Sequence, residues 1–136
     1  MANTYPEKID LFLVAESLRQ ERGGKITILG AFSGGRVLLS KGGTFPVALP
    51  IAFLIAFNVG KGHFKTRIRI TDPNGEPVVE DLPTGDIDKA PEQTMQLMVN
   101  FGVFEFSMPG RYRVDSFLDD RVYTEYLNVG VGYQTF

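Results

Sequence analysis

The sequence of 136 residues contains no cysteine, no tryptophan and a single histidine, His63. Without cysteine, the chain can form no disulfide bond, no thiolate metal site and no cysteine nucleophile. One histidine without cysteine does not complete a typical zinc site, and no local signature places a serine and an aspartate beside it as in a hydrolase triad. We therefore expect a protein that is not an enzyme and that carries no cofactor.

The sequence also lacks a strong charge of one sign and any long hydrophobic segment. The formal net charge is −2, which gives the chain no general attraction to nucleic acid or to anionic lipid. The longest apolar run, residues 47–57, contains Pro50 and is too short to span a bilayer. The N-terminus is polar and lacks the apolar core of a signal peptide. We expect a soluble, cytoplasmic protein that binds neither nucleic acid nor membranes.

The composition is that of a globular domain. Hydrophobic residues make up 43% of the chain and charged residues 22%, which is far from the composition of a disordered segment. A chain of this length buries about two thirds of its unfolded surface, enough for a core without disulfides. No linker, internal repeat or low-complexity segment divides the sequence, so we predict one domain over residues 1–136.

Short alternating segments between glycine and proline turns predict β-strands throughout. The clearest one follows the turn pair Pro109-Gly110, where residues 111–118 alternate between two faces before the turn at Asp119-Asp120. Residues 83–92, rich in proline, glycine and acidic residues, are predicted as a long loop. Gly102 is a natural place for a bulge within its strand. The other predicted strands are residues 50–57, 63–71, 78–82, 94–106 and 122–131.

The segment 109–114 resembles the corner of immunoglobulin-like domains, in which a turn glycine precedes a strand tyrosine two residues before the second core cysteine. Tyr112 matches that tyrosine, and Val114 stands at the cysteine position. The resemblance implies an all-β, two-sheet immunoglobulin-like antiparallel β-sandwich in which the Tyr112 hydroxyl bonds nearby backbone. The predicted strands would then be strands B to G, and residues 9–39 would supply strand A and an extra N-terminal strand or hairpin.

The chain as a whole is similar to a group of small, uncharacterised bacterial β-sandwich proteins. The segments Ile28-Leu-Gly-Ala-Phe32 and Phe45-Pro-Val-Ala-Leu-Pro50 carry this resemblance. The group brings no established activity with it. The function therefore has to be argued from the surfaces of the predicted sandwich.

Basic side chains recur on the outward side of two predicted strands. They are Lys65, Arg67, Arg69, Arg111 and Arg113. In an immunoglobulin-like sheet strands C and F are neighbours, so these side chains would form one positive patch for an acidic protein partner. The alternative is that Asp115 and Glu125 lie on the same face and pair with the arginines, at little net energy.

Acidic side chains gather at one end of the predicted sandwich. If the strands alternate in direction, residues 58–62, the loop 83–92 and the turn after residue 118 share that end. The carboxylates collected there are Asp86, Asp88, Asp119 and Asp120. A hard cation such as Ca²⁺ takes six to eight oxygen ligands from such loops, although the spacing matches no EF-hand. Turn aspartates that bond their own backbone are the alternative interpretation.

Residues 50–57 are apolar on both faces, whereas a strand of a two-layer sandwich buries only one face in the core. The other face must be covered by the N-terminal segment or by another subunit, and the sequence leaves both possibilities open. In the second case Leu54 is a candidate contact of a homodimer, the commonest form of oligomer.

We therefore predict a non-enzymatic binding or assembly module that makes protein–protein contacts through a sheet face, with a protein partner or by self-association. The alternative is a cation- or small-ligand-binding sandwich that uses the acidic loops at the Asp119-Asp120 end.

Overall fold

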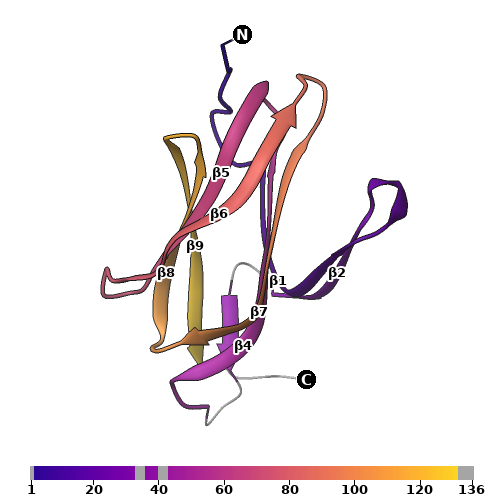
Figure 1. Ribbon diagram of the computed structural model, residues 1–136. Coiled ribbons are helices and arrows are strands. Elements are labelled where there is room, and N and C mark those ends of the chain that lie inside the picture. The colour runs from indigo at the N-terminus through magenta and orange to yellow at the C-terminus, as the bar shows by residue number, and fades with distance from the viewer. Residues whose placement is uncertain (1, 33–35, 40–42, 132–136) are drawn as a thin grey trace.

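The computed structural model describes residues 2–32, 36–39 and 43–131, which form two packed β-sheets (Figure 1). The first sheet has the strand order β2 (Ile26–Ala31), β1 (Leu11–Gln20), β4 (Val47–Phe57) and β7 (Met95–Phe106). The second has the order β3 (Arg36–Leu39), β9 (Arg121–Val131), β8 (Gly110–Leu118), β5 (Gly62–Thr71) and β6 (Pro77–Lys89). Neighbouring strands are antiparallel except β3 and β9, which are parallel. The predicted fold class, an all-β two-sheet antiparallel sandwich with an added N-terminal hairpin, is confirmed.

One short 3₁₀ turn, η1 (Arg22–Gly24), connects β1 to β2. Within the described residues, no helix is long and apolar enough to cross a membrane.

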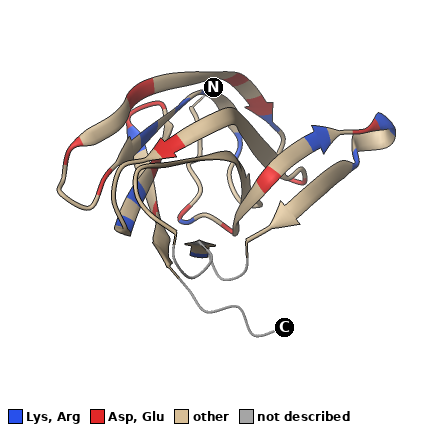
Figure 2. Cartoon of the chain, turned by 90° about the horizontal axis from the view of Figure 1, so that it is seen from below, with Lys and Arg blue, Asp and Glu red and all other residues tan. Residues whose placement is uncertain are grey.

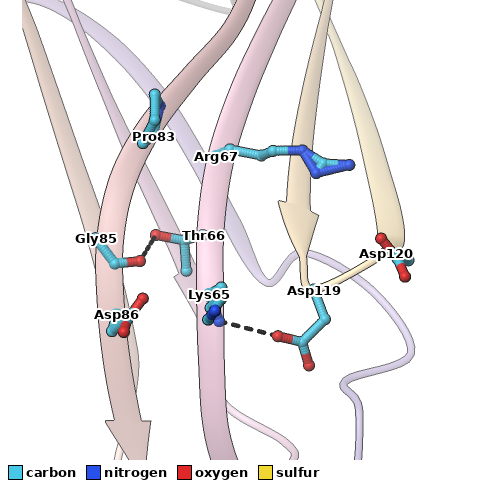
Figure 3. A pocket seen from close by; sticks show the side chains of 8 residues that line it. All are labelled: Lys65, Thr66, Arg67, Pro83, Gly85, Asp86, Asp119 and Asp120. Atoms are coloured by element: carbon cyan, nitrogen blue, oxygen red, sulfur yellow. Dashed lines mark hydrogen bonds between the residues drawn. The ribbon is translucent and has the colours of Figure 1, made fainter.

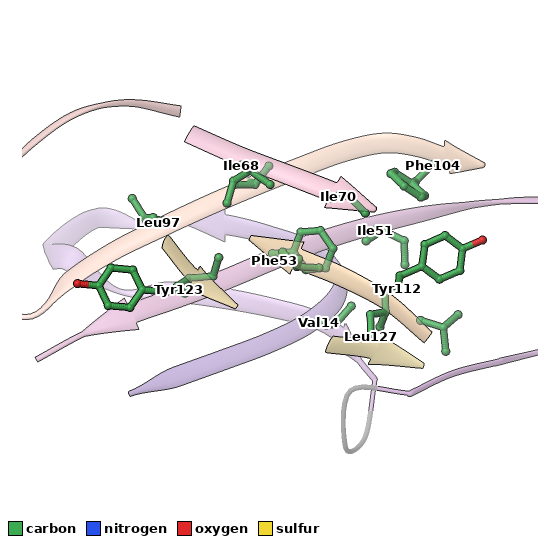
Figure 4. Close-up of a cluster of buried hydrophobic side chains, with 14 of the residues drawn as sticks. Val14, Ile51, Phe53, Ile68, Ile70, Leu97, Phe104, Tyr112, Tyr123 and Leu127 are labelled. Carbon is green, nitrogen blue, oxygen red and sulfur yellow. The ribbon is translucent and has the colours of Figure 1, made fainter. Parts of the chain in front are cut away.

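The core lies between the two sheets and is built by the period-two alternation of the strands (Figure 4). Phe53 of β4, Ile68 of β5, Tyr112 of β8 and Leu127 of β9 all point into it and are almost fully buried. The rings of Phe106 and Tyr112 pack edge to face, with 5.3 Å between their centroids. The inward and outward faces predicted for residues 63–71 and 111–118 are therefore confirmed.

The predicted corner is present at the start of β8. The Tyr112 hydroxyl donates a hydrogen bond of 2.8 Å to the backbone oxygen of Met108. Val114, at the position of the immunoglobulin cysteine, is fully buried. Gly110 has a φ of +134°, and a Cβ at this position would lie 2.7 Å from Cγ of Pro73. Only glycine fits this turn without displacing the neighbouring loop.

Each predicted strand coincides with a strand of the structure, and the one predicted for residues 78–82 is longer than expected. The predicted strands B and E are the neighbours β4 and β7, and C, F and G are the neighbours β5, β8 and β9. The residues predicted as strand D are the first part of β6, which pairs with β5 as far as Lys89. The loop predicted for residues 83–92 is therefore wrong for its first seven residues. A shift of register opposite Pro83 and Gly85 accommodates these residues, and an edge strand tolerates proline because no neighbour needs its N–H.

The bulge predicted at Gly102 is confirmed. On β4, Leu49 and Ile51 are two residues apart, whereas their partners on β7, Phe104 and Phe101, are three residues apart. The extra residue of β7 returns Phe104 to the core side, where it is buried with Phe101 packed against it.

The chain's own N-terminal hairpin covers the second apolar face of β4. The base of the hairpin forms a small cluster with the outer side of this sheet, and Leu18 and Leu54 are almost fully buried in it. The Asn100 side chain of β7 fastens the hairpin, because it accepts a hydrogen bond from Leu18 N (2.9 Å) and donates one to Leu18 O (3.2 Å). Leu54 is only 4% exposed within a single chain. Of the two coverings that the sequence left open, the structure thus contains the one by the N-terminal segment, and the contact of Leu54 with a second subunit stays a prediction.

Beyond this contact, the tip of the β1–β2 hairpin extends away from the sandwich (Figure 1). Residues of both charge signs lie at that tip, as Figure 2 shows.

Candidate binding face and the acidic end of the sandwich

The outward side of β5 and β8 carries the predicted basic residues. Because β5 and β8 are hydrogen-bonded neighbours, Arg67 lies opposite Phe117, and Arg69 lies opposite Asp115. Arg111 lies on the same side of β8 and faces Asn128 of β9. The structure therefore brings the basic residues of the two strands onto one sheet face, which we call the arginine face and which comprises the outward side of β5, β8 and β9.

Aromatic rings beneath the guanidinium groups organise the arginine face. The guanidinium carbons of Arg67 and Arg69 lie 4.0 Å and 5.1 Å from the centroid of the Phe117 ring. The guanidinium carbon of Arg111 lies 3.5 Å from the centroid of the Tyr126 ring. A cation over the face of an aromatic ring is attracted by the ring quadrupole. Phe117 is accordingly buried although it points away from the core.

Polar contacts fix three of the arginines through their Nε atoms. Arg67 Nε lies 3.1 Å from Oδ1 of Asp81. Arg69 Nε donates to the backbone oxygen of Glu80 (3.1 Å). Arg113 Nε donates to Oδ2 of Asp115 (3.1 Å). A guanidinium held by its Nε keeps its outer amino groups available for a further acceptor.

Asp115 is the one acidic residue buried in this face. It is 2% exposed and accepts hydrogen bonds from Arg113 Nε and from the Thr124 hydroxyl (2.7 Å). The expected pairing of Asp115 with an arginine is therefore confirmed. Glu125, however, lies opposite Val114, which points into the core, so it does not share the arginine face.

Sequence reasoning missed Tyr126 and Asp81 as parts of this face. The alternation of residues 122–131 was a usable signal for Tyr126, because Tyr123 and Leu127 occupy the opposite, inward positions. Asp81 had no such signal, because its place next to Arg67 depends on β6 pairing with β5.

Three of the four predicted aspartates line one cavity at the acidic end, as Figure 3 shows. This cavity has a volume of about 420 Å³. The side chains of Asp86, Asp119 and Asp120 share it with the basic residues Lys65 and Arg67. The expectation that these acidic side chains gather at one end is met for the three, although Asp86 lies on a strand and not in a loop.

The Asp119 carboxylate is held by three donors of the protein itself. It accepts hydrogen bonds from the Tyr5 hydroxyl (2.6 Å), from Lys65 N (3.0 Å) and from Nδ2 of Asn3 (3.2 Å). These donors, Tyr5 foremost, lower the pKa of the Asp119 carboxyl below its ordinary value. Asp119 thereby fastens the N-terminal segment and the β8–β9 turn to β5.

His63 contacts Asp86 and Asp88, two of the other three predicted acidic side chains. Its Nδ1 lies 2.6 Å from Oδ1 of Asp88, and its Nε2 lies 3.6 Å from Oδ2 of Asp86. The hydrogen bond with Asp88 raises the pKa of His63 above its usual 6.5. Over residues 2–32, 36–39 and 43–131, no group of three or more acidic or histidine side chains is arranged to hold a metal ion.

Comparison with known families adds one assignment. Residues 10–128 match the model of a family of unknown function, DUF6941. The chain belongs to this family. No curated protein matches the sequence.

Solved structures with a similar shape are distant from this DUF6941 chain. A β-glucosidase from Listeria innocua is 14% identical, with a TM-score of 0.43, over 92% of this chain and 16% of the enzyme. The CARDB domain of the PF1109 protein from Pyrococcus furiosus, solved with di-metal ions, is 15% identical over 95% of this chain and 100% of that domain, with a TM-score of 0.40. This chain thus spans less than a fifth of the glucosidase, and neither similarity identifies an activity for it.

Proposed function

We propose that this protein is a non-enzymatic binding module whose arginine face holds a carboxylate-rich segment of a protein partner. The observation that carries the proposal is the stacking of Arg67, Arg69 and Arg111 on two aromatic rings. A planar guanidinium matches a carboxylate through two parallel hydrogen bonds. Stacking, together with the Nε contacts of Arg67 and Arg69, reduces the rotamer freedom that these long side chains lose when a partner binds.

Charge on the face also supports an acidic partner. Arg67 and Arg113 are compensated by Asp81 and Asp115. Arg69 and Arg111, in contrast, take part in no ion pair within the part of the chain that the structure describes. The face therefore keeps a surplus of positive charge although the whole chain is slightly acidic.

Cation binding at the acidic end has less support as an alternative function. Lys65 and Arg67 line the same cavity as the aspartates and oppose a bound cation electrostatically. The oxygens of Asp119 already accept hydrogen bonds from three donors. We therefore favour the arginine face.

The proposal is tested with a labelled ten-residue peptide of alternating glutamate and serine. Alternate residues of an extended peptide lie on one side, as Arg67 and Arg69 do on β5. We expect fluorescence anisotropy to show binding that weakens with added salt. Changing both Arg69→Gln and Arg111→Gln should weaken it about tenfold. Neither substitution leaves an unpaired acidic residue behind.

Two controls make the result specific. Arg22→Gln changes an exposed cation at the hairpin tip, outside the arginine face, and should leave the affinity unchanged. A peptide with glutamine in place of glutamate should not bind. Equal binding of both peptides, or an equal loss in the Arg22 variant, would contradict the proposal.

A further inference from the structure

Lys89 places a charged side chain inside the end of the sandwich. It is the last residue of β6 and lies opposite Gly62 of β5, two residues after Ile87, which packs against the core. The same alternation turns the Lys89 side chain inward, and the residue is only 4% exposed. Lysine is almost never buried to this degree unless its charge is paired.

Two backbone carbonyl groups account for part of the hydrogen bonding of Lys89. Its Nζ donates to the oxygen of Gly60 (2.8 Å) and to the oxygen of Ala90 (3.1 Å). These bonds fasten the two loops that close this end of the sandwich. An ammonium group has three N–H donors, however, and carbonyl groups do not neutralise its charge. No ion pair of the described residues includes Lys89.

A cavity of about 440 Å³ adjoins this lysine. Lys89, Lys61 and Gln93 are among the residues that line it. Asp88 is the one acidic residue of the lining, and its carboxylate lies 2.6 Å from His63 Nδ1. Two lysines therefore line the cavity together with an aspartate whose carboxylate already has a partner.

We propose that this cavity binds a small oxyanion, either a carboxylate or a phosphate. The anion accepts the remaining N–H of Lys89 and a hydrogen bond from the ammonium group of Lys61, and it compensates the buried charge. The site is separate from the arginine face and does not depend on its function. If Lys89 serves only to fasten the two loops, added anions will have no specific effect at this site.

Titration of the protein with inorganic phosphate, followed by amide NMR shifts at constant ionic strength, tests the proposal. We expect saturable shifts at the backbone amides of Lys61, Gly62 and Ala90. A matched titration with acetate distinguishes the two kinds of anion, because a site for phosphate responds to phosphate alone, whereas a site for carboxylates responds to both. Chloride at the same ionic strength should cause no saturable change.

Two exposed lysines provide the decisive variants. Lys61→Gln should raise the half-saturating concentration about fivefold or more, since one of the two cations is lost. Lys8→Gln, which removes an exposed lysine outside the cavity lining, should leave it unchanged. Lys89→Met should abolish the shifts, and if this variant does not fold, the Lys61 variant still decides. Shifts that do not saturate, or an equal effect of both exposed-lysine variants, would overturn the proposal.

Discussion

The Tyr112 hydroxyl and the backbone oxygen of Met108 are joined by a hydrogen bond of 2.8 Å, which closes the corner between β7 and β8. The ring of the same tyrosine is buried against Phe106. Removing the hydroxyl leaves the ring packing in place, but the partly buried carbonyl group of Met108 loses this hydrogen bond. We expect Tyr112→Phe to lower the free energy of unfolding by about 1 kcal/mol.

Urea unfolding measures this change as a lower midpoint with an unchanged m-value. Tyr126→Phe is the matched control, because the Tyr126 side chain is exposed and its hydroxyl makes no hydrogen bond with the described residues. If Tyr112→Phe costs no more than this control, the corner is not a structural hydrogen bond.

Leu54→Arg tests whether the hairpin covers β4 within one chain. The substitution buries an unpaired charge in the cluster that Leu54 forms with Leu18. We expect it to destabilise the fold by about 3 kcal/mol or more. Val103→Arg on β7, where Val103 is 70% exposed, should change stability little. Light scattering beside the unfolding curves distinguishes the alternatives, since a folded variant of reduced mass would indicate a subunit interface.

Much of this fold follows from local patterns in the sequence. The turn at Pro109-Gly110, the alternation of residues 111–118 and the bulge at Gly102 are determined by residues close in the chain, and the sequence predicted them. The extent of β6 depends instead on β5, because pairing with β5 keeps Pro83 and Gly85 in a strand. Considered locally, the proline and glycine in these residues predict a loop.

In the candidate sites, too, some features follow from the local sequence and others depend on the neighbouring strands. The outward alternation of arginines on β5 and β8 was visible in the sequence. The stacking of Arg111 on Tyr126 and the burial of Lys89 were not visible, because each depends on which strands and loops become neighbours. For Leu54 the sequence left two possibilities open for a related reason. Residues 50–57 are apolar on both faces, which shows that the second face is covered but not which segment covers it.

Ser116→Ala should leave stability unchanged or raise it by up to about 1 kcal/mol. The Ser116 hydroxyl is buried on the core side of β8 and has no hydrogen-bond partner within the described part of the chain. Alanine removes this unsatisfied group at the cost of a very small change in volume. Thermal unfolding measures the effect, and a marked decrease in stability would show that the hydroxyl has a partner in the folded protein.

The pKa of His63 should be measurable directly, because it is the only histidine of the chain. The hydrogen bond to Asp88 raises this pKa above 6.5, so an NMR titration should give a higher value. Asp88→Asn should bring the pKa back towards 6.5. A pKa at or below 6.5 in the unmodified protein would exclude the contact in solution.

The sign of the linked stability effect follows from the direction of this shift. A raised folded-state pKa means that protonated His63 stabilises the protein fully below its unfolded-state pKa of about 6.5. This contribution is lost as the pH rises through the folded-state pKa. As the pH rises above about 6.5, unfolding midpoints should therefore fall more in the unmodified protein than in the Asp88→Asn variant.

Mapping the acidic peptide on the protein by amide NMR shifts tests the proposed function most directly. We predict that the largest shifts lie on the outward residues of β5, β8 and β9, around Arg69, Phe117 and Tyr126. These shifts should vanish when Arg69 and Arg111 are both glutamine. Shifts that instead cluster at the hairpin tip, or that persist unchanged in this double variant, would contradict the proposed function.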